Sequence, residues 1–364
     1  MNSSTNEREL DAAIKAFSKV LEHRQFILGP EVHELETRLS SLFGWRYAIG
    51  CNSGFGAHLL SLIALGIGPD KRVLVPAFGS YAFPGAVLRR RAVPVFMDLT
   101  AETFRVGIDI LRESMTTNID AIVFQELFSD IEPWIDVAKV VGAVPVVSVI
   151  TYSMWAYAER PIDSAGPKLA TACLRDQYTL GAYGDAGTIW TNDGVLDHKI
   201  RHIRTEDHKS AIHEGYDSGN FHQDSIHAAL LLELLDTRIA QAKTRATAIQ
   251  NMVETLSKAQ IDELVVPGIY QGRSSHLVVF AKYRDTLLDF LLSRGIRASA
   301  LWTVPVHLQP GFKGLGYQKG DFPNAERASA ENLVLPLLKQ PKEIINLINQ
   351  IKQFYSSENR TGNW

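Results

Sequence analysis

Two kinds of residue in this chain could support chemistry on a charged small molecule. Ser53 and Gly54 form a turn between a short predicted strand and a predicted helix. Backbone N–H groups at such a helix start, together with the positive end of the helix dipole, favour an anion. Tyr178, His222 and His307 can move protons near neutral pH when their surroundings tune the pKa of each group. The candidate chemistry is therefore anion binding combined with acid–base catalysis.

A glycine-spaced stretch organises the segment that carries Tyr178. The sequence from Leu180 to Gly187 is LGAYGDAG, and it runs into the β-branched stretch Thr188–Thr191. Glycines are favoured where a backbone bends tightly or approaches another group, and a short apolar run after them indicates a buried strand. We therefore expect a tight turn followed by a strand that ends at Asn192.

Apolar runs that alternate with helical segments predict βαβ units and a mostly parallel sheet. The predicted strands are Tyr47–Gly50, Arg72–Pro76, Ala92–Asp98, Ala121–Gln125, Val144–Ile150, Thr188–Thr191 and Leu277–Ala281. The predicted helices are Leu10–Leu21, Glu31–Phe43, Ala57–Leu65, Phe83–Arg91, Ile131–Val141, Asp224–Leu235, Ala240–Lys258, Leu287–Gly295 and Ile344–Phe354. Because Asp224–Leu235 is so apolar, we expect it to be buried and to form part of a dimer interface.

Composition narrows the class of protein. The 364 residues suffice for two domains, and 46% hydrophobic with 21% charged residues is ordinary for a globular enzyme. A net charge of −3 argues against nucleic acid or an anionic membrane as partner. Two cysteines make no disulfide framework, and we find neither a membrane span nor a signal peptide, so we expect a cytoplasmic protein.

The glycine stretch resembles the signature of the DegT/DnrJ/StrS sugar aminotransferases, which are pyridoxal-phosphate enzymes of fold type I. The Gly29-Pro-Glu-Val segment and the stretch Ala298–His307 resemble the same family, and the likeness covers roughly residues 26–355. It implies an α/β, aspartate-aminotransferase-like large domain with a mostly parallel sheet, followed by a smaller α/β domain. The expected division is an N-terminal helix at 1–25, a large domain at 26–238, a small domain at 239–358 and a tail at 359–364.

The positions that the family uses for its cofactor are changed in this chain. The Schiff-base lysine of the family aligns with Tyr178, and the aspartate that holds the pyridinium nitrogen aligns with Val149. The serine and threonine that hold the cofactor phosphate align with Cys173 and Phe55, whereas Ser53 and Gly54 match. A phenol cannot form an imine, and a valine cannot hold a pyridinium.

Three further positions follow from the resemblance. Tyr81 lies in the loop where the family stacks an aromatic ring on the cofactor. In family dimers one motif reaches into the partner's site. Asn220 matches the asparagine of this motif, and His222 stands in place of its arginine. His208, His213, His222 and His227 cluster in sequence, but their spacing is not that of a metal site, so we expect none.

Two interpretations remain open. In the first, the chain is a non-catalytic or regulatory homologue that binds no pyridoxal phosphate, or binds it weakly. It would act in nucleotide-sugar metabolism (surface polysaccharide or secondary metabolite), as a homodimer or paired with an active paralogue, and could bind a nucleotide-sugar. In the second, it is a cofactor-independent enzyme on a nucleotide-linked sugar, with Tyr178, His222 or His307 as acid or base. A true aminotransferase would need a non-standard lysine such as Lys168.

Overall fold

A seven-stranded sheet forms the centre of the larger lobe. The computed structural model describes residues 3–115, 118–128, 132–158, 162, 165–175, 180–205, 217–268 and 274–357, with the backbone alone for 3–8. In this part of the chain the strand order is β1-β7-β6-β5-β4-β2-β3, and every strand except β7 runs in the same direction. The strands are β1 (Tyr47–Cys51), β2 (Arg72–Pro76), β3 (Val93–Met97), β4 (Ala121–Gln125), β5 (Val146–Val149), β6 (Leu169–Cys173) and β7 (Gly187–Thr191).

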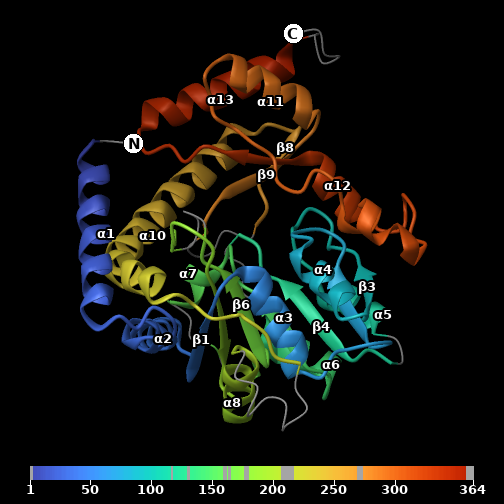
Figure 1. Ribbon diagram of the computed structural model, residues 1–364. Coiled ribbons are helices and arrows are strands. Elements are labelled where there is room, and N and C mark those ends of the chain that lie inside the picture. Colours follow the sequence, from blue (N-terminus) through green and yellow to red (C-terminus); the bar gives the residue numbers. More distant parts are fainter. Residues whose placement is uncertain are drawn as a thin grey trace.

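Helices cover both faces of this sheet (Figure 1). On one face Phe43 of α2 packs edge-on against Trp190, and Trp134 of α6 packs against Phe124. The other face carries α3, which contacts β6 and β7 and bonds to Thr171. The helices of this lobe are α2 (Pro30–Phe43), α3 (Gly54–Ala64), α4 (Ala82–Arg89), α5 (Ile108–Ser114), α6 (Trp134–Val141), α7 (Met154–Tyr157) and α8 (Gly194–Ile203). A parallel sheet buried on both faces explains the continuous apolar strand sequences.

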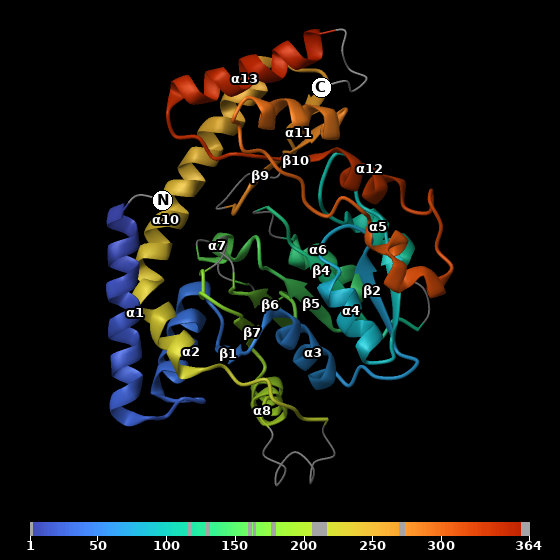
Figure 2. The ribbon, with the colours of Figure 1, turned by 45° about the horizontal axis from the view of Figure 1, so that its top comes forward.

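The smaller lobe is built on an antiparallel sheet of order β10-β9-β8. Figure 2 shows this sheet beneath α11 and α13 and above the larger lobe. A proline at the first position and a capping box begin α13, which stabilises that helix start. The elements are β8 (Leu264–Val265), β9 (Leu277–Ala281), α11 (Arg284–Ser293), η1 (Val306–Leu308), η2 (Pro310–Leu315), α12 (Pro323–Glu331), β10 (Asn332–Leu335) and α13 (Pro341–Ser356).

One helix, α10 (Ser225–Ala259), joins the two lobes. The sequence predicted two helices here, and that prediction was wrong, because the 35 residues form one continuous helix. Its first half packs in the apolar cluster under the large sheet, and Ile249, Met252 and Leu256 pack in the small lobe's cluster. The predicted domain boundary at 238/239 therefore lies inside a helix.

The apolar residues of α10 are covered within the chain. The N-terminal helix α1 (Ser3–His23) packs along α10 through Ala16 and Val20, which meet Ala229, Leu230 and Leu234. This burial removes the reason we gave for placing Asp224–Leu235 at a dimer interface. Four large apolar side chains of α1 stay exposed although α1 packs on α10. They are Leu10, Ile14, Phe17 and Leu21, which are 45–60% exposed.

The α/β class and the mostly parallel sheet predicted from the sequence are confirmed. Six of the seven large-sheet strands coincide with predicted strands within two residues at each end. The sequence missed β6, whose run Leu169–Cys173 is rich in alanine and weak in β-branched residues. It also missed α8, although Asp193 caps that helix through the N–H groups of Val195 and Leu196.

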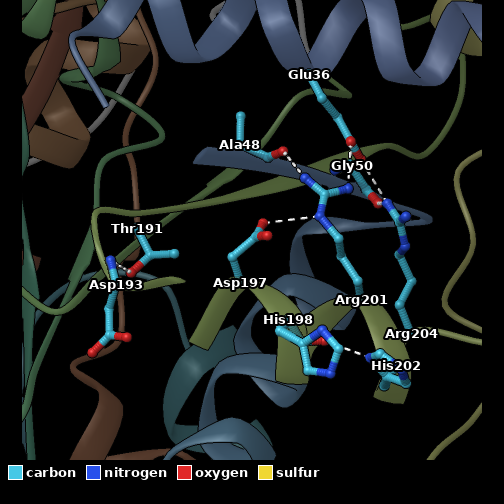
Figure 3. A network of polar contacts seen from close by, with 10 residues as sticks. All are labelled: Glu36, Ala48, Gly50, Thr191, Asp193, Asp197, His198, Arg201, His202 and Arg204. Atoms are coloured by element: carbon cyan, nitrogen blue, oxygen red, sulfur yellow. Dashed lines mark hydrogen bonds and ion pairs between the residues drawn. The ribbon is translucent and has the colours of Figure 1, made fainter. Parts of the chain in front are cut away.

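A buried carboxylate fixes the edge strand β1 to its surroundings (Figure 3). Glu36 of α2 accepts hydrogen bonds from Arg201 and Arg204 of the α8 end, each at 2.6 Å, and from the Gly50 N–H at 2.8 Å. Arg201 also bonds the Ala48 carbonyl, and Arg204 bonds that of Gly50 at 2.7 Å. These contacts join α2, β1 and α8, and β1 leads directly into the Ser53 turn.

Replacing this carboxylate tests how much the fold depends on it. Glu36→Gln removes the negative charge and leaves two guanidinium groups beside an amide, with Arg204 almost fully buried. We expect the free energy of unfolding, measured by urea denaturation, to fall by about 3 kcal/mol. Asp236→Asn breaks an ion pair with Arg38 in which the aspartate is 82% exposed, and it should change stability by less than about 1 kcal/mol. Equal effects of the two substitutions would contradict this role for Glu36.

Candidate functional site

The Ser53 turn lies at the carboxyl edge of the large sheet, packed against two other strands. Ser53 is the N-cap of α3, and its hydroxyl accepts a hydrogen bond from the Gly56 N–H at 3.0 Å. A Cβ on Gly54 would lie 2.6 Å from that of Cys173, and one on Gly187 would lie 2.2 Å from the Ser53 carbonyl oxygen. Both positions thus require glycine. The structure brings together Ser53, Gly54 and Cys173, and their role in holding a phosphate stays a prediction.

Further contacts fix Cys173 and the turn in place. Cys173 donates its N–H to the Thr151 hydroxyl at 3.0 Å. Cys51 and Cys173 both pair with Gly187 in the sheet, one on each side of β7. Burial raises the pKa of the Cys51 thiol to about 12, so this group stays protonated and packs as an apolar side chain.

Asn220 meets the turn within its own chain. The Asn52 amide side chain donates to the Asn220 carbonyl at 3.1 Å, and the Asn52 N–H donates to that of Phe221. The Asn220 side chain itself is exposed. Its predicted reach into a partner's site stays a prediction.

Val149 has neutral neighbours in the sheet. It pairs with Gln125 of β4 on one side and with Thr171 of β6 on the other. Since paired residues of adjacent strands share a face, these three side chains form one row toward α3. His58 of α3 meets this row, with its Nδ1 3.0 Å from the Thr171 hydroxyl. Neither flanking strand therefore supplies a carboxylate at the level where the family carries its aspartate.

His58 is an uncharged group at this place. Burial lowers its pKa to about 3, so the imidazole is neutral at physiological pH. Its ring packs against Phe83 at 4.8 Å between centroids. The sequence analysis missed His58, Gln125 and Thr171. The available signals were a single histidine in the mostly apolar helix Gly54–Ala64 and a glutamine at the end of a buried strand.

The loop that carries Tyr81 is held by Gln125. The Gln125 side chain accepts a hydrogen bond from the Ser80 N–H at 2.9 Å and donates one to the Ser80 carbonyl at 3.1 Å. Tyr81 follows as the N-cap of α4, with 63% of its surface exposed. Phe55 is 42% exposed, and its ring is 3.9 Å from a Cβ placed on Gly85 of α4. Its bulk therefore lies between α3 and α4.

The opposite face of the sheet holds a buried acid. Glu126, directly after β4, accepts hydrogen bonds from the hydroxyl of Ser148 and from that of Tyr157 at 2.6 Å. Burial, and next the nearby Glu126 carboxyl, raise the pKa of Tyr157 well above its usual range, so its phenol acts as a donor. Ser148 lies next to Val149 and points to the other face. This carboxyl is thus separated from the Val149 row by the sheet.

Of the three candidate acid–base residues, the structure describes His222 and His307. Tyr178 lies outside the residues that the structure describes, as do His208 and His213. The His307 side chain is fully buried, 3.3 Å from Glu326, between Phe96 and Phe322. Burial lowers its pKa, against the effect of Glu326. His222 is partly buried just after Phe221.

Lys168 lies at the far end of β6. It directly precedes this five-residue strand and is 3.9 Å from Asp193. Cys173 ends the strand, so roughly 16 Å of extended backbone separate the two. Lys168 is therefore remote from the Ser53 turn, which counts against its use as a substitute Schiff-base lysine.

Two structural features are absent from the part of the chain that the structure describes. Its histidine, cysteine and carboxylate side chains form no group of three or more that could hold a metal ion. None of its helices has the length and apolar character needed to cross a membrane.

Comparison with known proteins places this architecture. The sequence model of the DegT/DnrJ/EryC1/StrS aminotransferase family matches residues 7–351. The chain belongs to this family. It is 31% identical over 353 residues to a pleiotropic regulatory protein of Geobacillus stearothermophilus, covering 94% of each chain. It is 27% identical over 338 residues to UDP-2-acetamido-2-deoxy-3-oxo-D-glucuronate aminotransferase of Pseudomonas aeruginosa, covering 90% of each.

Solved structures share the fold. DesV of S. venezuelae, in complex with a ketimine intermediate, superposes with a TM-score of 0.85 at 21% identity, covering 98% of this chain and 97% of that one. An aminotransferase of the same family from Brucella abortus gives 0.81 at 24% identity, covering 98% of each. The predicted family and the aspartate-aminotransferase-like fold are thus confirmed.

The residues present fit one half of the family's cofactor. A phosphate could accept hydrogen bonds from the backbone N–H groups at the start of α3, beside Ser53 and Gly54, although Cys173 offers no hydroxyl. The ring half does not fit, because a pyridinium would meet Val149 and its neutral neighbours. No step of pyridoxal chemistry can be derived from these residues.

The neutral state of His58 predicts an acid-sensitive fold. Its pKa is about 3 when folded against 6.5 ordinarily, so the unfolded chain binds more protons between these values. Stability contributed by neutral His58 is thus present above pH 6.5 and is lost as the pH falls toward 3. Each unit of difference corresponds to about 1.4 kcal/mol. When the pH is lowered from 7 to 4.5, the free energy of unfolding of the wild type should fall by roughly 2 kcal/mol more than that of His58→Gln.

The control for this pH effect is His33→Gln, which removes an exposed histidine of α2. We expect it to leave the loss of stability between pH 7 and 4.5 as in the wild type. Parallel pH profiles for His58→Gln and the wild type would contradict the assignment.

Proposed function

We propose that this chain is a member of the sugar aminotransferase family that has lost transamination and acts by binding a nucleotide-sugar. The observation that carries the proposal is the neutral row Gln125–Val149–Thr171 at the ring end of the family's site. Without a carboxylate, the ring nitrogen is not kept protonated and the cofactor loses its character as an electron sink. Tyr178 in the lysine position and the remote Lys168 point the same way.

The names of the relatives support a regulatory role. The Geobacillus stearothermophilus relative is called a pleiotropic regulatory protein. Another, 27% identical over 332 residues, is called the erythromycin biosynthesis sensory transduction protein EryC1. The Pseudomonas aeruginosa relative acts, by its name, on a UDP-linked sugar. In this chain we propose a nucleotide-sugar as ligand and the cytoplasm as location.

A cofactor-independent enzyme is the second candidate. The histidines that we proposed as acid or base give it uneven support. His307 is buried among aromatic rings, whereas His222 directly follows the segment that contacts Asn52. Turnover of a nucleotide-sugar without added cofactor, lost in His222→Gln, would favour this candidate over the regulatory one.

The state of the cofactor is the primary test. We expect the purified protein to show no aldimine absorption band with or without added pyridoxal phosphate, because the lysine position holds Tyr178. Calorimetry should detect weak or no binding of pyridoxal phosphate, and binding of one member of a panel of nucleotide-sugars. A visible band abolished by borohydride would overturn the proposal. So would tight binding of the cofactor with no response to any sugar.

We further propose that the protein is a dimer, with α1 at the interface in place of α10. The exposed stripe on α1 continues through Phe26 and Ile27, which are 41% and 50% exposed. Ile27 bridges to Asp224, and the preceding residues 220–221 border the Ser53 turn. The backbone thus connects the segment that carries the stripe to the segment that borders the site. A second copy over this surface would cover the stripe and complete the site, as expected for Asn220.

A charge on the α1 stripe tests the dimer. We expect a dimer at micromolar concentration in sedimentation velocity, and a shift toward monomer for Phe17→Asp, because the introduced carboxylate would be buried unpaired. Ile345→Asp, on the exposed side of α13 in the small lobe, is the matched control and should remain dimeric. A monomeric wild type would contradict the proposal.

A further inference from the structure

We propose that a cavity between α10 and the small lobe binds the phosphate or diphosphate group of a small metabolite. The cavity has a volume of about 610 Å³. Its described lining comes from the segment after β6, from α10, and from the small lobe around β9 and β10. The residues used below are Glu9, Arg175, Tyr183, Arg238, Arg245, His276 and Arg297.

The lining is strongly cationic. The described lining contains four arginines and one carboxylate, that of Glu9, and the lining residue Arg175 is also 3.4 Å from Asp185 beside the cavity. Arg175 follows β6, Arg238 and Arg245 lie on α10, and Arg297 follows α11. Guanidinium groups from three segments that line one cavity suit an oxyanion with several charged oxygens better than a single carboxylate.

His276 adds polarity to the cavity without adding charge. Burial, and then the charge of Arg245, lower its pKa to about 4, so it is neutral at physiological pH. Ser275 lies 2.8 Å from its Nδ1 and also donates to the Tyr152 carbonyl. The ring is therefore held in one orientation within the wall.

Glu9 acts as an internal counter-ion at the cavity. Its carboxylate is 3.2 Å from Arg238, and it accepts a hydrogen bond from the Tyr183 hydroxyl. Arg238 also donates to the Leu180 carbonyl at 3.0 Å. Tyr183 has φ +50°, a conformation that a bulky residue adopts only at some cost in free energy. A bound phosphate would compete with Glu9 for Arg238, and so act on the turn Leu180–Tyr183.

The size and the opposite wall of the cavity allow more than a bare ion. The run Val334–Leu337 contributes an apolar wall at the end of β10. An organic group attached to the phosphate could pack there while the phosphate meets the arginines. The cavity and the Ser53 turn use different residues of one segment, since Cys173 meets Gly54 whereas Arg175, Gly181 and Tyr183 line the cavity.

Calorimetry with inorganic pyrophosphate tests the site in the full chain. We expect the wild type to bind, and Arg245→Ala and Arg297→Ala each to weaken binding by about tenfold or more, because each removes a charge-assisted contact. Arg297 is exposed, so its variant should fold even where Arg245→Ala does not. Glu9→Gln should bind more tightly than the wild type, since the competing carboxylate is gone.

The matched control is Arg112→Ala, which removes an exposed arginine of α5 that pairs with Asp109. It should bind pyrophosphate as the wild type does. Titration with inorganic phosphate and with UDP shows which part of the ligand is recognised. Tighter binding of UDP indicates that a nucleotide packs against the apolar wall. Equal binding of the two indicates that only the phosphate groups are recognised. Absence of pyrophosphate binding, or equal affinities across the arginine variants and Arg112→Ala, would overturn the proposal.

Discussion

The buried carboxylate of Glu36 is the constraint on which the geometry of the Ser53 turn depends. Two guanidinium groups and a backbone N–H converge on it, and both arginines also bond carbonyls of β1. A carboxylate surrounded in this way loses hydration but keeps its charge compensated. β1 is an edge strand of the sheet and pairs only with β7 among the described strands. The Glu36 network therefore holds β1 on the side where no other strand pairs with it.

The two halves of the family's site rest on different physical foundations. The phosphate half combines backbone N–H groups and glycine packing, which do not depend on side-chain chemistry, with two family hydroxyls that Cys173 and Phe55 do not supply here. The ring half needs one charged side chain at Val149 and an amine at Tyr178. Substitution can therefore remove the ring half without disturbing the turn. This explains how the fold and the Ser53 turn coexist here with a neutral Gln125–Val149–Thr171 row.

Much of this arrangement was predictable from the sequence, and the failures have identifiable causes. Apolar runs located most of the large-sheet strands, and the family resemblance assigned Cys173 and Gly54 to one site, where the structure places them in contact. A histidine in the helix Gly54–Ala64 was a signal for a buried polar group, but its contact with Thr171 was not predictable, because it depends on which side of α3 faces β6. The burial of His307 was not predicted, because the aromatic rings around it come from separate segments of the chain. The continuity of α10 could have been found, since 225–259 contains neither glycine nor proline.

That continuous helix also limits how the molecule can be divided experimentally. At 1.5 Å per residue, its 35 residues extend roughly 52 Å, with one end in the cluster of the large lobe and the other in that of the small lobe. A fragment cut at 238/239 would expose the apolar side of each half to water. A cut within α10 therefore does not separate the lobes cleanly. Limited proteolysis inside this helix should yield no stable fragment of either lobe.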